Sequence, residues 1–132
     1  MIVSFWDVQV ALDTRLYNDI SEMVTGVYDN PPGGVEFPYV NYGAPTSTPF
    51  DTKLSHGAEI TFQIDIWSQN GTKECSVIMG AIEEALENEP LPMGDGFSMA
   101  MKRLEYAEIL DDQDGKTKHG VLQYRVIIEK EE

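Results

Sequence analysis

The sequence predicts an α+β fold, a two-layer sandwich in which two helices cover a mainly antiparallel sheet of about four or five strands. Two segments carry one apolar stripe each at helical spacing, and other segments alternate apolar and polar residues as strands do. The length of 132 residues suits a single domain that spans residues 1–132. The predicted order of elements is α-β-β-β-α-β-β.

The first helix is expected to begin near Ser4, a candidate N-cap that is followed three residues later by Asp7. Its apolar residues recur at spacings of three and four, which is typical of an amphipathic helix. This stripe consists of Val8, Ala11, Leu12, Leu16, Ile20 and Met23. Gly26 is well placed to end the helix.

Two short strands and a long loop are expected next. Residues 27–28 and 37–42 have the composition of strands, and the Pro- and Gly-rich residues 30–34 separate them. Pro38 suits a strand end or a sheet edge because proline cannot donate to the ladder. Residues 43–57 show no periodic pattern, and a loop of about fifteen residues inside a compact domain is usually functional or disordered.

The strand expected at residues 58–68 has the clearest alternation in the chain. One face consists of Ile60, Phe62, Ile64 and Ile66. The other face consists of Thr61, Gln63, Asp65 and Trp67. One apolar face and one mostly polar face indicate an antiparallel sheet that is covered on one side.

The second half of the chain predicts a helix and then a hairpin. The helix at residues 72–88 has a stripe of Cys75, Ile78, Met79, Ile82 and Leu86. The strand at residues 97–110 changes phase near Lys102 and Arg103, which predicts a β-bulge. An acidic turn at residues 111–115 leads into a last strand at residues 118–129. The inward face of that strand is Leu122, Tyr124, Val126 and Ile128.

Composition excludes several classes of function. The formal net charge of −14 predicts a protein that repels nucleic acid, because phosphate binding requires clustered Lys and Arg. The single cysteine, Cys75, cannot form an intrachain disulfide. No apolar run approaches the roughly 20 residues that a membrane span needs. We therefore expect folding in a reducing, cytoplasmic setting, with no membrane partner.

No group of residues indicates catalysis, a metal or a cofactor. Cys75 lies on a predicted buried stripe, so neither His56 nor His119 is expected to activate it. One Cys and two distant His also lack the spacing of a zinc site. The protein is therefore not expected to be an enzyme. A small cytoplasmic enzyme or ligand-binding protein that uses Asp65 and His56 remains the alternative of another class.

The acidic turn after the fourth predicted strand resembles a calcium-binding loop only in part. With Gly115 as the sixth loop residue, the first and twelfth positions are Leu110 and Val121, where a calcium loop needs acidic ligands. A solvated hairpin turn explains the sequence better.

Other features predict contact between copies of the chain. Trp67 lies on the polar face of its strand, and an exposed Trp is typical of protein interfaces. The long loop and the strand that contains Pro38 lie beside an unprotected sheet edge. The predicted subunit interface consists of Pro38, Tyr39, Pro45, Phe50, Leu54, Asp65 and Trp67.

Over nearly its whole length the chain resembles the tail-terminator, or tail-completion, family of long-tailed phages and gene-transfer particles. The order and spacing of several short pieces carry this resemblance. They are the first helix with Leu12 and Leu16, Val27-Tyr28-Asp29 running into Pro31-Pro32, Phe37-Pro38-Tyr39-Val40, Asp65-Ile66-Trp67-Ser68, Ala81-Ile82-Glu83-Glu84-Ala85-Leu86, and a hairpin with Lys118-His119-Gly120-Val121.

The resemblance implies a structural virion protein with no catalytic residues. Such a protein would form a ring, commonly a hexamer, that caps the head-proximal end of the tail tube, ends its polymerisation and joins the tail to the head connector. Its partners would be its own copies, the tail tube protein and the connector protein. DNA would pass through without specific binding. Apart from the resemblance, the net charge of −14 predicts acidic side chains on the channel wall, and Asp111, Asp112 and Asp114 are candidates because a hairpin tip can project into the channel. A different neck or tail component of similar fold, such as a connector or a tube subunit, remains the alternative.

Overall fold

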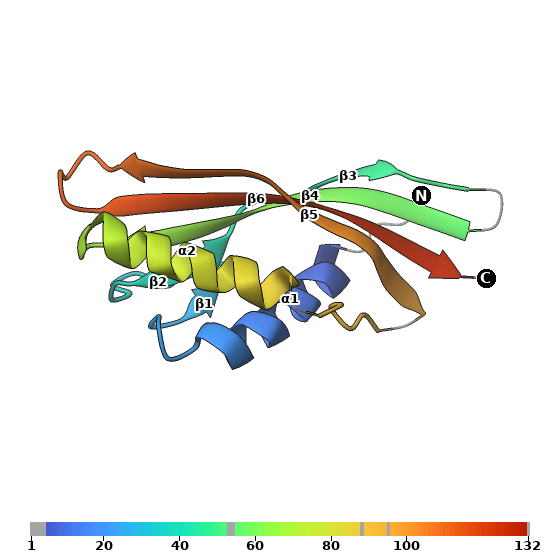
Figure 1. Cartoon of the computed structure of the whole chain (residues 1–132), viewed down its shortest axis with the longest axis horizontal. Coiled ribbons are helices and arrows are strands. Elements are labelled where there is room, and N and C mark those ends of the chain that lie inside the picture. Colours follow the sequence, from blue (N-terminus) through green and yellow to red (C-terminus); the bar gives the residue numbers. More distant parts are fainter. Residues whose placement is uncertain (1–4, 53–54, 88, 95, 132) are drawn as a thin grey trace.

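The computed structural model describes residues 5–52, 55–87, 89–94 and 96–131, with two helices packed on one face of a six-stranded sheet (Figure 1). The helices are α1 (Phe5–Ile20) and α2 (Gly71–Glu87). The strands are β1 (Val27–Tyr28), β2 (Tyr39–Tyr42), β3 (Thr46–Pro49), β4 (Ser55–Ser68), β5 (Phe97–Asp111) and β6 (Lys118–Glu131). The predicted α+β class is confirmed, and the described residues contain one strand more than the predicted order.

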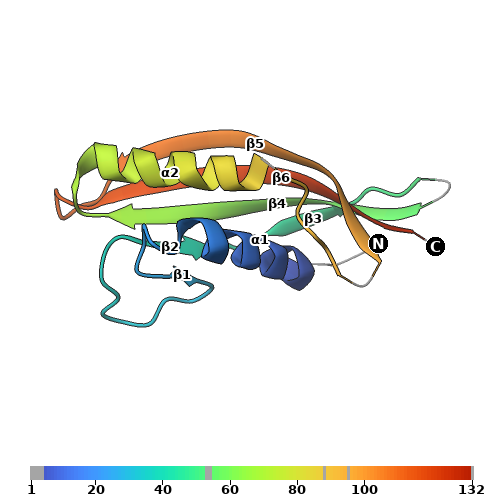
Figure 2. The same cartoon turned by 60° about the horizontal axis from the view of Figure 1, so that its bottom comes forward.

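The sheet has the strand order β1-β2-β4-β6-β5, and β3 also pairs with β4. β1 and β2 are parallel, whereas the other described pairs are antiparallel. β4 and β6 pair along their full length, from Ser55 opposite Glu131 to Ser68 opposite Lys118. Figures 1 and 2 show that the β3–β4 hairpin and the C-terminal end of β6 extend beyond the helices.

The core lies between the two helices and the inward face of the sheet. The alternation predicted for β4 is confirmed, since Ile60, Ile64 and Ile66 are fully buried and Phe62 is nearly so. The predicted inward residues of β6 are buried as well: Leu122, Tyr124, Val126 and Ile128. The Tyr124 ring stacks on Phe62 at a centroid distance of 5.7 Å.

The buried stripe of α1 is confirmed by Val8, Ala11, Leu12, Leu16 and Ile20. The helix ends at Ile20, so the predicted end at Gly26 is wrong. The chain turns earlier because the Thr25 amide donates to the Pro38 carbonyl at 2.8 Å, and the Val40 amide donates to the Gly26 carbonyl at 3.1 Å. These bonds draw residues 25–26 toward β2 and start the β1–β2 pair. The predicted N-cap Ser4 lies outside the described residues.

Figure 2 shows α1 and α2 lying side by side on the sheet, and an arginine ties them together. Arg15 of α1 donates to the Ala85 carbonyl at 2.7 Å, to the Pro90 carbonyl at 3.2 Å and to the Glu89 carbonyl at 3.3 Å. These carbonyls lie at and just beyond the end of α2, where the last carbonyls of a helix lack partners inside it. Neither helix that the structure describes is long and apolar enough to cross a membrane.

The prediction of an unbroken loop at residues 43–57 is wrong for the middle of this segment, which forms a strand. Thr46–Pro49 forms β3, which pairs with β4 from Thr46 opposite Thr61 to Pro49 opposite Ala58. β4 itself begins at Ser55, three residues earlier than predicted. Gly57 closes this hairpin: its carbonyl accepts from the Phe50 amide at 3.0 Å, and its amide donates to Asp51 Oδ1 at 3.1 Å.

The phase change in β5 comes from two irregularities. The register shifts between Met99 and Met101 and again between Leu104 and Tyr106. An irregularity of the strand was predicted near Lys102 and Arg103. The two register shifts lie on either side of these residues rather than at them. The second shift places Glu105 beside β6, where Arg125 Nε lies 2.8 Å from Glu105 Oε1.

Candidate interaction surfaces

The sheet face opposite the helices, here called the open face, carries aromatic, apolar and charged side chains. The register places on it Tyr39 and Asn41 from β2, Gln63, Asp65 and Trp67 from β4, His119 and Val121 from β6, and Tyr106, Glu108 and Leu110 from β5. Tyr106 and Leu110 are 47% and 41% exposed. Large exposed apolar side chains of this kind are frequent at interaction sites.

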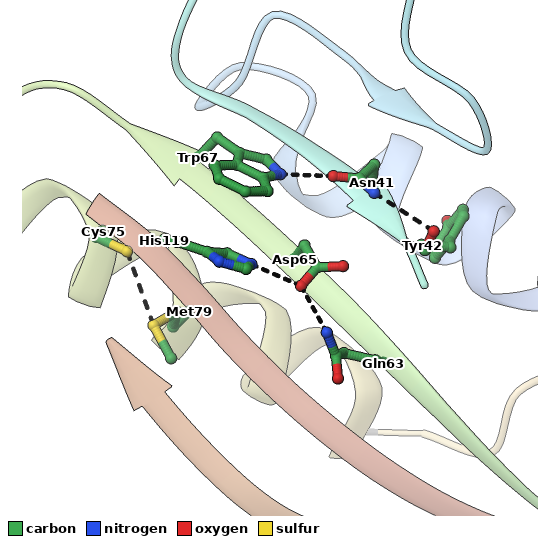
Figure 3. A network of polar contacts seen from close by, with 8 residues as sticks. All are labelled: Asn41, Tyr42, Gln63, Asp65, Trp67, Cys75, Met79 and His119. Carbon is green, nitrogen blue, oxygen red and sulfur yellow. Dashed lines mark hydrogen bonds and ion pairs between the residues drawn. The ribbon is translucent and has the colours of Figure 1, made fainter. Parts of the chain in front are cut away.

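Asp65 lies on the open face, but its carboxylate is bonded to neighbouring side chains of the same sheet (Figure 3). His119 Nε2 lies 2.7 Å from Asp65 Oδ1, and Gln63 Nε2 donates to the same oxygen at 2.8 Å. Asp65 is only 6% exposed. A buried carboxylate is tolerated where hydrogen bonds or an ion pair compensate for its lost hydration, and both partners come from its own sheet. Asp65 therefore orients its neighbours and offers little surface of its own.

Trp67 lies on the open face, opposite the core residues Ile60 to Ile66, as predicted. Its indole stacks on the His119 ring at a centroid distance of 3.9 Å, and the Tyr39 ring lies 6.3 Å away on the neighbouring strand. The Trp67 N–H donates to Asn41 Oδ1 at 2.6 Å (Figure 3). These contacts fix the orientation of a half-buried aromatic surface across β2, β4 and β6. Its part in a subunit interface stays a prediction.

The structure does not bring together the residues of the alternative enzyme site. His56 and Asp65 lie nine residues apart on β4. At 3.3 Å per residue this separation is about 30 Å. Cys75 and His119 lie on opposite faces of the sheet, because Cys75 packs beneath Gly120 on the helix side. Burial also raises the pKa of the Cys75 thiol, which disfavours the nucleophilic thiolate. Among the described residues, no group of three His, Cys, Asp or Glu side chains could hold a metal ion.

The acidic turn lies at the tip of the β5–β6 hairpin, and hydrogen bonds organise it. Asp114 Oδ1 accepts from the Thr117 amide at 2.7 Å and from the Lys116 amide at 2.9 Å. Together with the Thr117 hydroxyl, these donors lower the pKa of Asp114 to about 2. Asp112 accepts from the Gln113 amide, and Asp111 pairs with Lys118. Asp111, Asp112 and Asp114 all remain exposed, so they are available to a channel or to outer solvent.

The other predicted interface residues lie on the side of the molecule formed by β1, β2 and β3. Pro38, Tyr39 and Pro45 are half-buried, and Phe50 is 40% exposed. Tyr39 also contacts the rings of Phe37 and Tyr28, at centroid distances of 5.3 Å and 6.3 Å. The predicted interface residue Leu54 lies outside the described residues.

The sequence analysis missed a second apolar stripe on α1, on the side away from the core. Trp6, Val10 and Tyr17 are 69%, 45% and 70% exposed. They lie at positions i, i+4 and i+11 of the helix, which fall on one face. We call this set the outer stripe of α1. The helical spacing of Trp6, Val10 and Tyr17 can be seen in the sequence. These residues were overlooked because the buried stripe alone was enough to predict the helix.

The comparisons with known proteins agree with each other. A family model described as Tail completion protein gp17 matches residues 10–129. The tail completion protein gp17 of Bacillus phage SPP1 is 38% identical over 112 residues, which cover 85% of this chain and 83% of that protein.

Solved structures share the fold. The bacteriophage SPP1 gp17 protein has a TM-score of 0.62 and 33% identity, and the match covers 96% of this chain and 95% of that one. A chain in the virion of the native gene transfer agent particle has a TM-score of 0.85 over 98% of this chain and 99% of its own, and its 19% identity shows the shared fold alone.

The family model and the SPP1 relative confirm the predicted family, and with it a structural role in the phage tail and a place in the virion. The chain belongs to the Tail completion protein gp17 family.

Proposed function

We propose that the protein forms a closed ring of identical subunits, a hexamer, at the head-proximal end of the tail tube. The ring ends polymerisation of the tube protein and presents its other surface to the head connector. The family match over residues 10–129 carries this proposal.

The surface of the single chain supports self-association. Trp6, Tyr17, Tyr106 and Leu110 expose between 41% and 70% of their surface, on the helix layer and on the open face. Aromatic residues are enriched at interfaces, and exposed apolar clusters mark the surfaces that a partner covers.

One edge of the proposed subunit interface is the side formed by β1, β2 and β3. Pro38, Tyr39, Pro45 and Phe50 lie there, and Trp67 stacks near Tyr39. Asp65 supports this surface from the same face of the sheet, because its carboxylate contacts His119, on which Trp67 stacks. Leu54 is kept in the proposed interface because it belongs to the same segment of the sequence as Pro45 and Phe50.

DNA is proposed to pass through the ring without binding. The net charge of −14 repels phosphate, and a channel wall close to DNA acts within the screening length of about 8–10 Å at ordinary salt. Asp111, Asp112 and Asp114 are proposed to face the channel, because a hairpin tip can project into it. No shift of double-stranded DNA is expected in a gel at low salt, whereas a clear shift would contradict the charge argument.

The growth of tube protein tests termination directly. Light scattering follows polymerisation of the purified tube subunit with and without a small molar fraction of this protein. We expect growth to stop early in its presence, with tubes that stay short. Rings that bind the connector protein but leave tube growth unchanged would instead support a different neck component.

A further inference from the structure

Beside α2, on its β5 side, an open groove of about 370 Å³ is unfilled by the chain itself. Its wall is formed by Ser76 and Gly80 of α2, and its floor by Leu104, Ala107 and Ile109 of β5. Leu104 and Ile109 are only partly buried, and a Cβ placed on Gly80 would contact no atom within 4 Å. We call this the α2–β5 groove. It can receive side chains from one face of a helix that lies beside α2.

The outer stripe of α1 lies on the opposite side of the molecule. The sheet order is β1-β2-β4-β6-β5, and α1 packs against β1 and α2, whereas the α2–β5 groove lies along the last strand. Figure 2 shows α2 between α1 and β5. The stripe and the groove therefore face away from each other within one chain, and they can meet only between two copies.

We propose that the outer stripe of α1 of one subunit docks into the α2–β5 groove of the next. This inference rests on the ring proposed above and names the contact that builds it. Two different surfaces that meet head to tail make a heterologous interface, which closes into a ring when the rotation between subunits allows. The helix layers of neighbouring subunits then continue as α1, α2, α1, α2 around the ring.

The two surfaces match in length. The stripe from Trp6 to Tyr17 spans about 16 Å at 1.5 Å per residue of helix. The floor from Leu104 to Ile109 contains a bulge and lies opposite Tyr124 to Gly120, so it spans about 13 Å at 3.3 Å per residue of strand, which is comparable with the stripe. Val10, near the middle of the stripe, would meet Ala107, which is exposed between the two larger floor residues.

The two surfaces also match in hydrogen-bonding chemistry. Glu83 lines the α2–β5 groove with a carboxylate acceptor, whereas the Glu108 carboxylate at its edge accepts from the Tyr106 hydroxyl on the open face. Trp6 and Tyr17 each carry one N–H or O–H donor at the tip of an apolar ring, which suits a contact that is apolar inside and polar at its edge. Among the residues that the structure describes, neither Lys nor Arg lines the groove.

The same residues give the contact an unusual charge dependence. Asp13 lies beside the outer stripe, and Glu83 lines the groove, so like charges approach each other on docking. Salt screens this repulsion. Ring formation should therefore strengthen between low and moderate salt, the reverse of an interface held by ion pairs.

Mixed cysteine variants test which surfaces meet. Val10→Cys and Ala107→Cys are prepared as separate proteins, mixed, and treated with a short bismaleimide. The wild-type protein, whose single cysteine Cys75 is fully buried, is treated in the same way to measure background crosslinking. We expect crosslinked dimers in the mixture and none from either variant alone. Crosslinking of Val10→Cys with itself would show a two-fold contact and overturn the proposal, as would an uncrosslinked mixture that still forms rings. If the wild-type protein forms no ring at all, the proposed function fails instead.

Two substitutions of opposite charge at Val10 give a second test, which does not depend on the length of a crosslinker. Val10→Glu adds a second carboxylate beside Glu83, whereas Val10→Lys adds a cation there. We expect Val10→Glu to raise the concentration needed for half-assembly by about tenfold or more, as at interface hot spots, and Val10→Lys to assemble much better than Val10→Glu. Both variants change an exposed helix position, so circular dichroism should show an intact fold. Equal assembly of the two variants would exclude the groove as the docking site.

Discussion

His119 Nε2 lies 2.7 Å from Asp65 Oδ1, which joins the two central strands of the sheet on its open face. The His119 ring in turn stacks on Trp67. The sequence predicted that Asp65 and Trp67 share the polar face of β4, but the partner of Asp65 lies 54 residues away in the chain. One buried carboxylate thus helps to fix the orientation of the aromatic surface beside it.

Removal of that carboxylate should destabilise the folded chain. Asp65→Ala leaves two donors, Gln63 Nε2 and His119 Nε2, without their shared acceptor. The expected loss in the free energy of unfolding is about 1–3 kcal/mol, measured by urea denaturation. Asp65→Asn keeps an acceptor oxygen and should lose less. An Asp65→Ala variant as stable as wild type would mean that these contacts add nothing to the fold.

Trp67→Ala should cost assembly more than folding. Trp67 lies outside the buried core and stacks on His119 and Tyr39, so its loss removes a half-buried surface and leaves the packing beneath the helices intact. Size-exclusion chromatography with light scattering should show a folded monomer. Trp67→Phe, which keeps an aromatic ring but loses the donor to Asn41, is the matched control. An insoluble or unfolded Trp67→Ala protein would refute this assignment.

Deletion of residues 45–54 should leave a folded chain that no longer assembles. The deletion removes β3 and the hairpin connection, so the first residues of β4 must form the new connection from Ala44, whereas Ile64 to Trp67 can keep their pairing with β2 and β6. Because Pro45 and Phe50 belong to the proposed interface edge, the ring should be lost while the circular dichroism spectrum persists. Rings formed by the deletion variant would show that this segment is not part of the contact.

The acidic turn should lose stability as the pH falls. Hydrogen bonds from Thr117 and Lys116 lower the pKa of Asp114 from 3.8 to about 2. Since the folded pKa lies below the unfolded one, the stabilisation is complete above about pH 4 and is lost as the pH falls toward 2. Asp114→Ala should lower the midpoint of thermal unfolding at pH 7, and the difference from wild type should shrink at pH 2. A constant difference across that range would show that ionisation of Asp114 does not matter to the turn.

The sequence predicted the fold class because its strongest patterns coincide with the core. The alternation of Ile60, Phe62 and Ile64 and the buried stripes of both helices all match the structure. β3 was missed because Thr46-Ser47-Thr48 has no apolar face, and its strand conformation comes from pairing with β4. The early end of α1 was missed for a related reason, since the bond from Thr25 to Pro38 depends on a strand that comes later in the chain.

The interaction surfaces were predictable only in part. Trp67 stands out in the sequence because it interrupts a polar face. Asn41 and His119, which orient it, carry no local pattern and become its neighbours only through strand pairing. The α2–β5 groove is a gap between two elements, and no single segment contains it.

Electron microscopy of the purified protein mixed with its tail tube subunit tests the central claim most directly. The account predicts rings of uniform diameter in the protein alone, and one ring bound at a single end of each tube in the mixture. Tubes with two bare ends beside a protein that stays monomeric at the same concentration would contradict it.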